Sequence, residues 1–242
     1  MKGSFILFMA SVLYISAAAN FLQSQEKDAD REWKRCTDLS LQKHEQGKYE
    51  EGIAWAQKAL EIARKHFGPK HPDTLTSICN LAVIYHNHEK YEEEMLLYEE
   101  LLALRKQVLG DKHPDTLVAM NNLAWLYERQ NKYEKALLLY EEVLALRKQV
   151  LGDKHPDTLQ SMHNLAWLYS QQGKYEKAEI LGEEAMALRK QVLGDKHPDT
   201  LHSMSNLAVF YAYQVKYEKA EILGKEAMAL RKQVLGDKHP DT

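Results

Sequence analysis

The octapeptide LGDKHPDT occurs four times in the chain, at Leu109–Thr116, Leu151–Thr158, Leu193–Thr200 and Leu235–Thr242. Its HPDT core begins at a constant spacing of 42 residues, at His71, His113, His155, His197 and His239. A fixed period of this length is typical of stacked supersecondary units, each of which buries its apolar face against a neighbour. The period therefore predicts an array of similar units in place of one globular core.

Five units follow from this period, because a degenerate unit precedes the first HPDT. Its segment EQGKYEEGIAWAQKALEIARKHFG resembles SQQGKYEKAEILGEEAMALRKQVLG in the fourth unit. We expect a solenoid over residues 31–236, preceded by a separate N-terminal segment, 1–30, and followed by the start of a truncated sixth unit, 237–242. The five units span 31–68, 71–110, 113–152, 155–194 and 197–236.

The third unit illustrates the first helix of each pair. Pro114 suits the first helical position, where its missing N–H costs nothing, and Asp115 suits the positive end of the helix dipole. Apolar side chains then recur at helical spacing and predict one buried face: Leu117, Met120, Leu123, Ala124 and Tyr127. Asn131, and Gly173 in the fourth unit, tolerate the left-handed backbone that ends a helix.

A second helix should run from about Tyr133 to Val150. Its inward side chains are expected to be Ala136, Leu139, Val143, Leu146 and Val150. Arg147 and Lys148 lie in its last turns, where a cation is favourable at the negative pole of the helix. A glycine follows as the stop residue. No segment alternates with period two, so the predicted fold class is all-α, built of antiparallel helix pairs.

These motifs resemble a known family. N-L-A-x-x-Y, then K-Y-E-x-A, a long helix and G-D-K-H-P-D-T resembles the tetratricopeptide repeat (TPR), and the 42-residue form is similar to that of kinesin light chains. The resemblance covers Arg31–Thr242. It implies a right-handed α-solenoid of about five TPR units that binds proteins, as a kinesin-light-chain-like cargo adaptor does. The residues before the repeats lack the heptads with which kinesin light chains dock their motor.

In this family the first helix of each repeat lines the concave side of the solenoid. In the fourth unit the resemblance assigns this lining to Gln160, His163, Asn164, Trp167, Ser170 and Gln171. Across the repeats we expect a peptide-binding groove formed by Asn80, Asn122, Asn164, Asn206, Trp125, Trp167, Arg129, Gln160, His163, Gln171, His202 and Tyr213.

A comparison between repeats supports this assignment. The fourth and fifth units differ at 8 of 42 positions, and five of these are lining positions, whereas their second helices differ at one residue. The third and fourth units differ at 11 positions, of which four are lining positions. The differences favour selection on the inner surface; the alternative is random drift after a recent duplication.

Two sets of lining residues have a functional and a structural interpretation. Asn80, Asn122, Asn164 and Asn206 occupy one position in four units, with Asp38 at that position in the first. Because an amide both donates and accepts, a ladder of Asn can hold a peptide backbone, as in clamp-type relatives, or can bond a neighbouring helix and set repeat geometry. Trp125 and Trp167 can form an aromatic shelf for a ligand side chain or act as partly buried spacers.

Composition argues against several function classes. A net charge of −3, with 28% charged residues, is not the basic excess that a nucleic-acid-binding protein needs. Cys36 and Cys79 form neither a disulfide framework nor a zinc pattern, and we expect both to be ordinary packing residues. The recurring histidines should lie roughly 10 Å apart, too far to share a metal ion.

No catalytic motif is present in the sequence. There is no zincin motif, no nucleophile elbow and no glycine-rich phosphate loop. An active site needs unlike residues that converge asymmetrically, which a regular array disfavours. We therefore predict that the chain is not an enzyme, with no catalytic residues, no metal ligands and no cofactor.

The N-terminus has a pattern of its own. Lys2 is followed by an apolar run from Phe5 to about Ile15 and by Ala17–Ala19, the layout of a secretory signal peptide cleaved near residue 19. The run is short for a membrane span, which needs about 20 residues, and the repeats contain none. The alternative is a helix that packs on the first repeat. Localisation stays open, because these residues favour secretion and the family resemblance favours the cytoplasm.

Two functions from different classes are compatible with this pattern. The first is a non-enzymatic scaffold that binds an extended peptide of a protein partner in its concave groove. The alternative is an assembly role through end-to-end or dimeric stacking, since solenoids normally close with a polar capping helix. This alternative predicts that the last second helix exposes apolar side chains to water: Leu223, Ala227, Leu230 and Val234.

Overall fold

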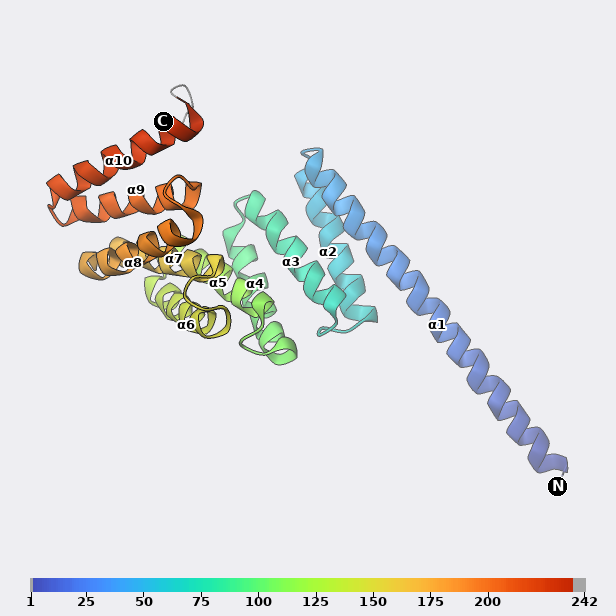
Figure 1. Ribbon diagram of the computed structural model, residues 1–242. Coiled ribbons are helices and arrows are strands. Elements are labelled where there is room, and N and C mark those ends of the chain that lie inside the picture. The colour runs from blue at the N-terminus through green and yellow to red at the C-terminus, as the bar shows by residue number, and fades with distance from the viewer. Residues whose placement is uncertain (1, 237–242) are drawn as a thin grey trace. The chain divides into compact units, whose positions relative to one another are not determined.

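The structure is a computed structural model that describes the backbone of residues 2–236 and the side chains of residues 23–234 and 236. Within this range the chain forms ten α-helices and no strand (Figure 1). In order they are α1 (Lys2–Glu45), α2 (Tyr49–His66), α3 (Pro72–Asn87), α4 (Tyr91–Leu109), α5 (Pro114–Arg129), α6 (Tyr133–Leu151), α7 (Pro156–Gln171), α8 (Tyr175–Leu193), α9 (Pro198–Tyr213) and α10 (Tyr217–Leu235). The predicted all-α class is confirmed.

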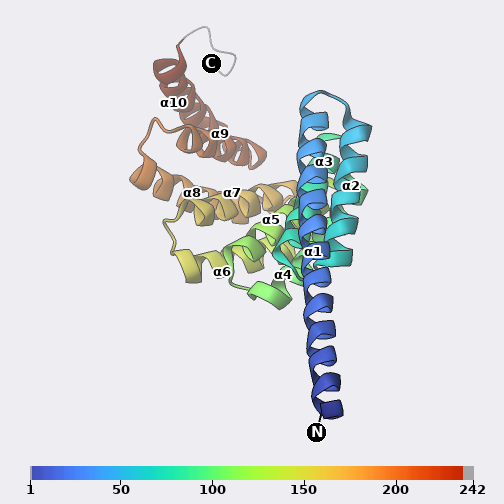
Figure 2. The ribbon, with the colours of Figure 1, turned by 90° about the vertical axis from the view of Figure 1, so that its right-hand side faces the viewer.

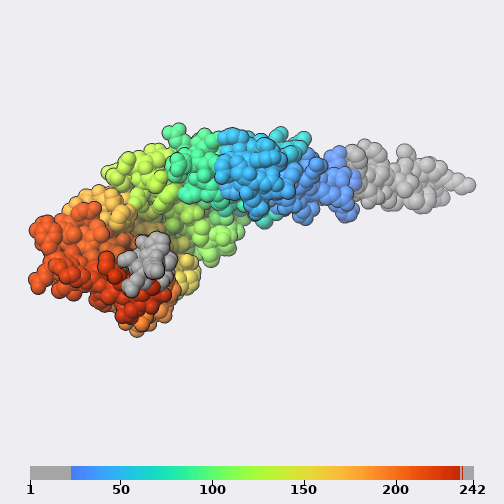
Figure 3. Space-filling model, turned by 90° about the horizontal axis from the view of Figure 1, so that it is seen from above, coloured from blue at the N-terminus to red at the C-terminus, as the bar shows by residue number. Residues whose placement is uncertain are grey.

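The helices fall into two compact parts, an N-terminal half (residues 1–108) and a C-terminal half (residues 109–242). In the C-terminal half α5 packs on α6, α7 on α8 and α9 on α10, and each pair contacts the next through α6–α7 and α8–α9. Figure 2 shows the α7–α8 pair between its two neighbours. In Figure 3, α9 and α10 form the orange and red end of the C-terminal half. The first helices α7 and α9 also contact each other directly.

The four recurring histidines within the described residues are helix caps. In α5 the side chain of His113 accepts a hydrogen bond from the backbone N–H of Asp115, with a 3.2 Å separation of Nδ1 and N, and Pro114 occupies the first turn as predicted. Three other helices begin with the same cap, at His71, His155 and His197. This bond satisfies one of the backbone donors that every helix start leaves without a partner in its own helix.

The first helix of each pair ends at a residue with left-handed backbone. Asn131 and Gly173 have φ angles of 57° and 71°, as their residue types predict. The second and fifth units place other residue types at this position, Glu89 with a φ of 56° and Val215 with a φ of 63°. A β-branched side chain in this region is strained.

Burial confirms the predicted face of the first helix and corrects that of the second. Leu117, Met120, Leu123, Ala124 and Tyr127 are all buried in α5. In α6 the inward prediction is right for Ala136 and Val143, but it is wrong for Val150, which is 43% exposed. Tyr140 and Arg147 are buried in α6 in addition.

Arg147 is buried because its guanidinium reaches the next repeat. Its Nη1 donates to the carbonyl oxygen of Asp157 at 2.9 Å and to Oγ of Ser161 at 2.8 Å. Arg189 repeats this arrangement one unit later, at 3.1 Å from the carbonyl oxygen of Asp199 and 2.7 Å from Oγ of Ser203. These bonds compensate for the loss of water around each guanidinium and join successive repeats.

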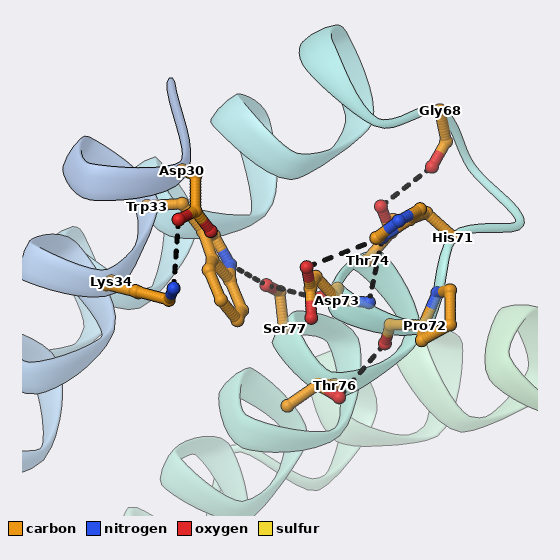
Figure 4. Close-up of polar contacts among 10 residues, drawn as sticks. All are labelled: Asp30, Trp33, Lys34, Gly68, His71, Pro72, Asp73, Thr74, Thr76 and Ser77. Carbon is orange, nitrogen blue, oxygen red and sulfur yellow. Dashed lines mark hydrogen bonds and ion pairs between the residues drawn. The ribbon is translucent and has the colours of Figure 1, made fainter. Parts of the chain in front are cut away.

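In the N-terminal half a tryptophan bonds the corresponding serine, because the position of Arg147 is Ala63 in the first repeat. The indole Nε1 of Trp33, on α1, donates to Oγ of Ser77 at 2.8 Å (Figure 4), and Ser77 occupies the position of Ser161. Cys36 is buried in the same cluster as Trp33, in agreement with its predicted packing role. The expected boundary at residue 31 falls inside α1, which continues without interruption from Lys2 to Glu45. The signal-peptide side chains lie outside the described residues.

The last hairpin corrects a further expectation. Ala227 is buried, and Leu223 and Leu230 pack beside it against Leu201 and Met204 of α9. The expectation that these three side chains face water is therefore wrong. Only Val234 of the predicted set is exposed. The set faces α9 because it forms the inside of its own hairpin. None of the helices within the described residues is both long and apolar enough to cross a membrane.

Candidate functional site

A cavity of about 250 Å³ opens on the C-terminal half, where the first helices α5, α7 and α9 lie together. Six of its lining residues were predicted groove residues: Trp125, His163, Asn164, Trp167, His202 and Asn206. Two were not predicted, Glu128 of α5 and Tyr140 of α6. The cavity therefore gathers side chains from three successive repeats.

Amide side chains connect the first helices beside this cavity. Nδ2 of Asn164 donates to Oδ1 of Asn121 at 3.0 Å, which links α7 to α5. Within α7, Nε2 of Gln160 donates to Oδ1 of Asn164 at 2.8 Å. In the next pair, Nδ2 of Asn206 donates to Nε2 of His163 at 3.2 Å. These contacts are those of the geometry-setting interpretation, although an amide retains a second N–H and a second lone pair for a ligand.

The same network reaches the buried arginine behind it. Nη2 of Arg189 donates to Oε1 of Gln160 at 3.0 Å. Gln160 is therefore held between Arg189 and Asn164, outside the cavity wall but in contact with it.

The two histidines of the cavity both have lowered pKa values. Burial, with smaller contributions from His202 and Arg189, lowers the pKa of His163 to about 3. The pKa of His202 is also lowered, first by burial and then by Arg189. Their rings lie 4.7 Å apart between centroids. Because Asn206 presents an N–H to Nε2 of His163, that nitrogen must carry a lone pair, which again requires the neutral ring.

Glu128 is the acid of the cavity. The hydroxyl of Tyr140 donates to its Oε2 at 3.1 Å. Burial raises the pKa of Glu128, an effect that the Tyr140 hydrogen bond opposes. The pKa of Tyr140 is raised well above its ordinary value by burial and by the adjacent carboxylate. The sequence pattern did not predict this pair, although Glu128 occupies the lining position that is Ser170 in the fourth unit.

Both tryptophans are half-buried and form walls of the cavity. The guanidinium carbon of Arg129 lies 5.3 Å from the centroid of the Trp125 ring, a cation–π distance. The ring of Trp167 lies 6.4 Å from that of Phe210. Each indole thus packs against the protein and still borders the cavity, so the shelf and spacer interpretations both remain compatible with its position.

The remaining predicted residues lie elsewhere. Gln171 is exposed, and Tyr213 stacks on Tyr175 with ring centroids 5.2 Å apart. Asn122 is half-buried in α5, and Asn80 is half-buried in α3 of the N-terminal half. Ser170, assigned to the lining by the family resemblance, is buried, and its hydroxyl donates to the carbonyl oxygen of Trp167 at 2.7 Å.

The N-terminal half has a larger cavity, of about 660 Å³, bordered by α2, α3 and α4. None of the predicted groove residues lines it. Three of its polar side chains are paired: Gln57 donates to the hydroxyl of Tyr85 at 2.9 Å, and Arg64 pairs with Glu100 at 2.6 Å. Among the described residues no group of three or more His, Cys, Asp or Glu is placed to hold a metal ion.

Comparison with known proteins identifies the repeats. The tetratricopeptide repeat family model matches residues 35–107, 97–149, 139–191 and 174–233. The crystal structure of a putative kinesin light chain from Podosopora anserina, with nearly identical TPR-like repeats, is similar with a TM-score of 0.73 at 26% identity, over 84% of this chain and 96% of that chain.

Other solved structures share the fold at lower identity. BtubC (BKLC) from P. vanneervenii is similar with a TM-score of 0.70 at 19% identity, over 90% of this chain and 94% of that one. MamA is similar with a TM-score of 0.61 at 13% identity, over 87% and 97% of the two chains. A search of curated protein sequences gave no match.

Proposed function

Because the chain belongs to the tetratricopeptide repeat family, we propose that it binds an extended peptide segment of a partner protein along the first helices of its repeats. The fold is that of a protein-interaction scaffold in general, and no catalytic family is indicated. The similarity to a putative kinesin light chain favours a cargo-adaptor-like module as the form of this function.

One observation carries the proposal: between the fourth and fifth units the second helix is almost unchanged, whereas the lining positions of the first helix vary. The second helices α8 and α10 differ at one position, Glu183 against Lys225. On the first helices, Trp167 becomes Val209 and His163 becomes Ser205. Side chains that only stack repeats should be copied with the frame, whereas side chains that read a ligand should differ where the ligand differs.

A peptide-display selection on the full chain tests this function. We expect enriched peptides whose binding weakens at least tenfold in a Trp125→Val/Trp167→Val variant, in which both walls carry the residue found at position 209. The matched control is Leu138→Ala/Ile180→Ala, on exposed positions of the second helices, and it should leave binding unchanged. No enrichment, or equal binding to the wild type and the tryptophan variant, would rule out the groove.

Self-association through α10 is the second candidate. Gly182 of α8 packs against Phe210, whereas a Cβ at the equivalent Gly224 of α10 would meet no atom within 4 Å. Ile222 and Met228 on the same helix are exposed. An apolar surface of this kind favours contact with another helix. Sedimentation velocity should then show dimers that Met228→Glu dissociates; a monomer at all concentrations would exclude this candidate.

A further inference from the structure

The cavity of the C-terminal half contains a single acidic group among aromatic and neutral side chains. Trp125 and Trp167 contribute indole rings, and Tyr140 contributes its phenol. The histidine His163 is neutral, because burial lowers its pKa to about 3. Among the lining residues, Glu128 is the one acid, and a cation bound beside it would favour its carboxylate form.

Glu128 has an oxygen available for a ligand. Its Oε2 accepts the hydroxyl of Tyr140, and among the described residues no hydrogen bond reaches its Oε1. Burial raises its pKa, and no cationic side chain is among the groups that lower it. A carboxylate that has lost water without gaining a cation is stabilised strongly by a positively charged hydrogen-bond donor.

The aromatic walls favour the same kind of ligand. A cation over the face of an indole is attracted by the ring quadrupole, and tryptophan is the best aromatic partner. The chain contains an internal example at the rim, where the guanidinium of Arg129 lies 5.3 Å from the Trp125 ring. The alkyl stem of a Lys or Arg side chain also gains from contact with apolar surface.

We infer that this cavity binds a basic side chain of the bound peptide, with its cationic head against Glu128 and its stem along Trp125 and Trp167. The inference rests on the proposed function and names the residue type that the peptide must carry. The cavity volume, about 250 Å³, is below the ~300–1,000 Å³ of sites for drug-sized ligands and suits one side chain.

The basic side chain would also fix the register of the peptide, because the acid occurs in one repeat. At the position of Glu128 the other units with this helix carry His86, Ser170 and Ala212. Tyr140, which holds the carboxylate, is replaced by Gly182 in the fourth unit, and the ring of Phe210 lies 3.2 Å from where a Cβ would stand there. The third repeat is therefore the place where a cation is read.

An acidic ligand is the competing possibility, because Arg129 and Arg189 lie near the cavity. The Nη1 of Arg189 already donates to Asp199 and Ser203, and its Nη2 donates to Gln160. These bonds turn its donors toward the protein. The residues that line the cavity include the acid Glu128 and no Arg or Lys, so the lining favours a cation over a carboxylate.

The test uses butylguanidinium and butylammonium as side-chain probes and butyrate as the anionic counterpart. On the full chain, the indole N–H signals of Trp125 and Trp167, assigned with Trp→Phe variants, should shift saturably with either cation and not with butyrate. Trp33 and Trp55 are internal controls. Glu128→Gln, which retains an acceptor for the Tyr140 hydroxyl, should weaken cation binding at least tenfold, whereas the exposed control Glu134→Gln should not. Stronger binding of butyrate, or an unchanged affinity in Glu128→Gln, would overturn the inference.

Peptide selection separates this inference from the function on which it rests. Peptides with one invariant Lys or Arg whose enrichment is lost on Glu128→Gln would support both. Groove-binding peptides without a basic residue would overturn the cation site and leave the groove standing. Cation binding without any enriched peptide would support the site and reject the peptide-binding function.

Discussion

Nδ2 of Asn164 donates to Oδ1 of Asn121 at 3.0 Å, across the interface between α7 and α5. A residue predicted to hold a ligand thus also ties two repeats together. Asn164 and Asn206 combine features of both interpretations open from the sequence: each amide donates to another first helix, and each residue also lines the cavity.

Replacing Asn164 by Ala should therefore lower stability as well as binding. The variant leaves Oδ1 of Asn121 and Nε2 of Gln160 without their partner, and each such loss costs about 1 kcal/mol. We expect a decrease of about 1–3 kcal/mol in the free energy of unfolding, measured by urea denaturation. Gln171→Ala, at an exposed position of the same helix, should stay within about 0.5 kcal/mol. Equal effects of the two variants would contradict the network.

The left-handed residue of the fifth unit offers a stabilising substitution. Val215 has a φ of 63°, and this conformation costs a non-glycine residue about 1–2 kcal/mol. Val215→Gly should raise the free energy of unfolding by about 1 kcal/mol, after the entropy cost of glycine, and the melting temperature by about 2–4 °C. The reciprocal change Gly173→Val should have the opposite sign. If both substitutions shift the melting temperature in the same direction, strain is not the cause.

Arg189 should be required for the stacking of α8 on α9. Arg189→Met removes the donor to Ser203 and to the carbonyl oxygen of Asp199, and should cost about 2–4 kcal/mol. A double-mutant cycle with Ser203→Ala should show a coupling energy of about 1 kcal/mol or more. Arg231→Met is the matched control, because Arg231 has the same position in α10 and makes no hydrogen bond to another side chain within the described residues. Additive single effects would contradict a direct bond.

The period of 42 residues made the fold predictable, because HPDT marks the starts of α3, α5, α7 and α9, and Asn131 and Gly173 mark the turns within the third and fourth pairs. The first-helix face was predictable too, since Leu117, Met120 and Leu123 follow a simple apolar spacing. The second-helix face was not: Arg147 is polar by type, and its burial depends on Ser161 in the next repeat, which no local pattern reveals.

The candidate site was predictable only in part. Lining positions on α7 follow from helical spacing, and His163, Asn164 and Trp167 do border the cavity. The Glu128–Tyr140 pair was missed because its residues lie on the two helices of one hairpin, and their contact depends on how those helices face each other. Ser170 was misassigned to the open lining because its hydroxyl turns back to its own helix.

His163 should make stability depend on pH. Its pKa is about 3 in the folded chain against an ordinary value of 6.5, so the unfolded chain binds more protons between these limits. The contribution of the neutral ring is complete above about pH 6.5 and is lost as the pH falls toward 3, by up to ~1.4 kcal/mol per pH unit.

Between pH 7 and pH 5 the wild type should thus lose about 1–2 kcal/mol more stability than His163→Ser, which carries the residue found at position 205. Urea denaturation at the two pH values measures the difference. Parallel loss of stability in both proteins would show that His163 protonates normally in the folded chain.

The most direct test of the account is to locate a bound peptide on the repeats. A selected peptide carrying a photoreactive diazirine is bound to the full chain and irradiated, and the labelled residues are identified by mass spectrometry. The account predicts labels on α5, α7 and α9 around Trp125, Trp167 and Asn206. Labels concentrated instead on Leu138, Ile180 and Ile222, the exposed aliphatic residues of the second helices, would contradict it.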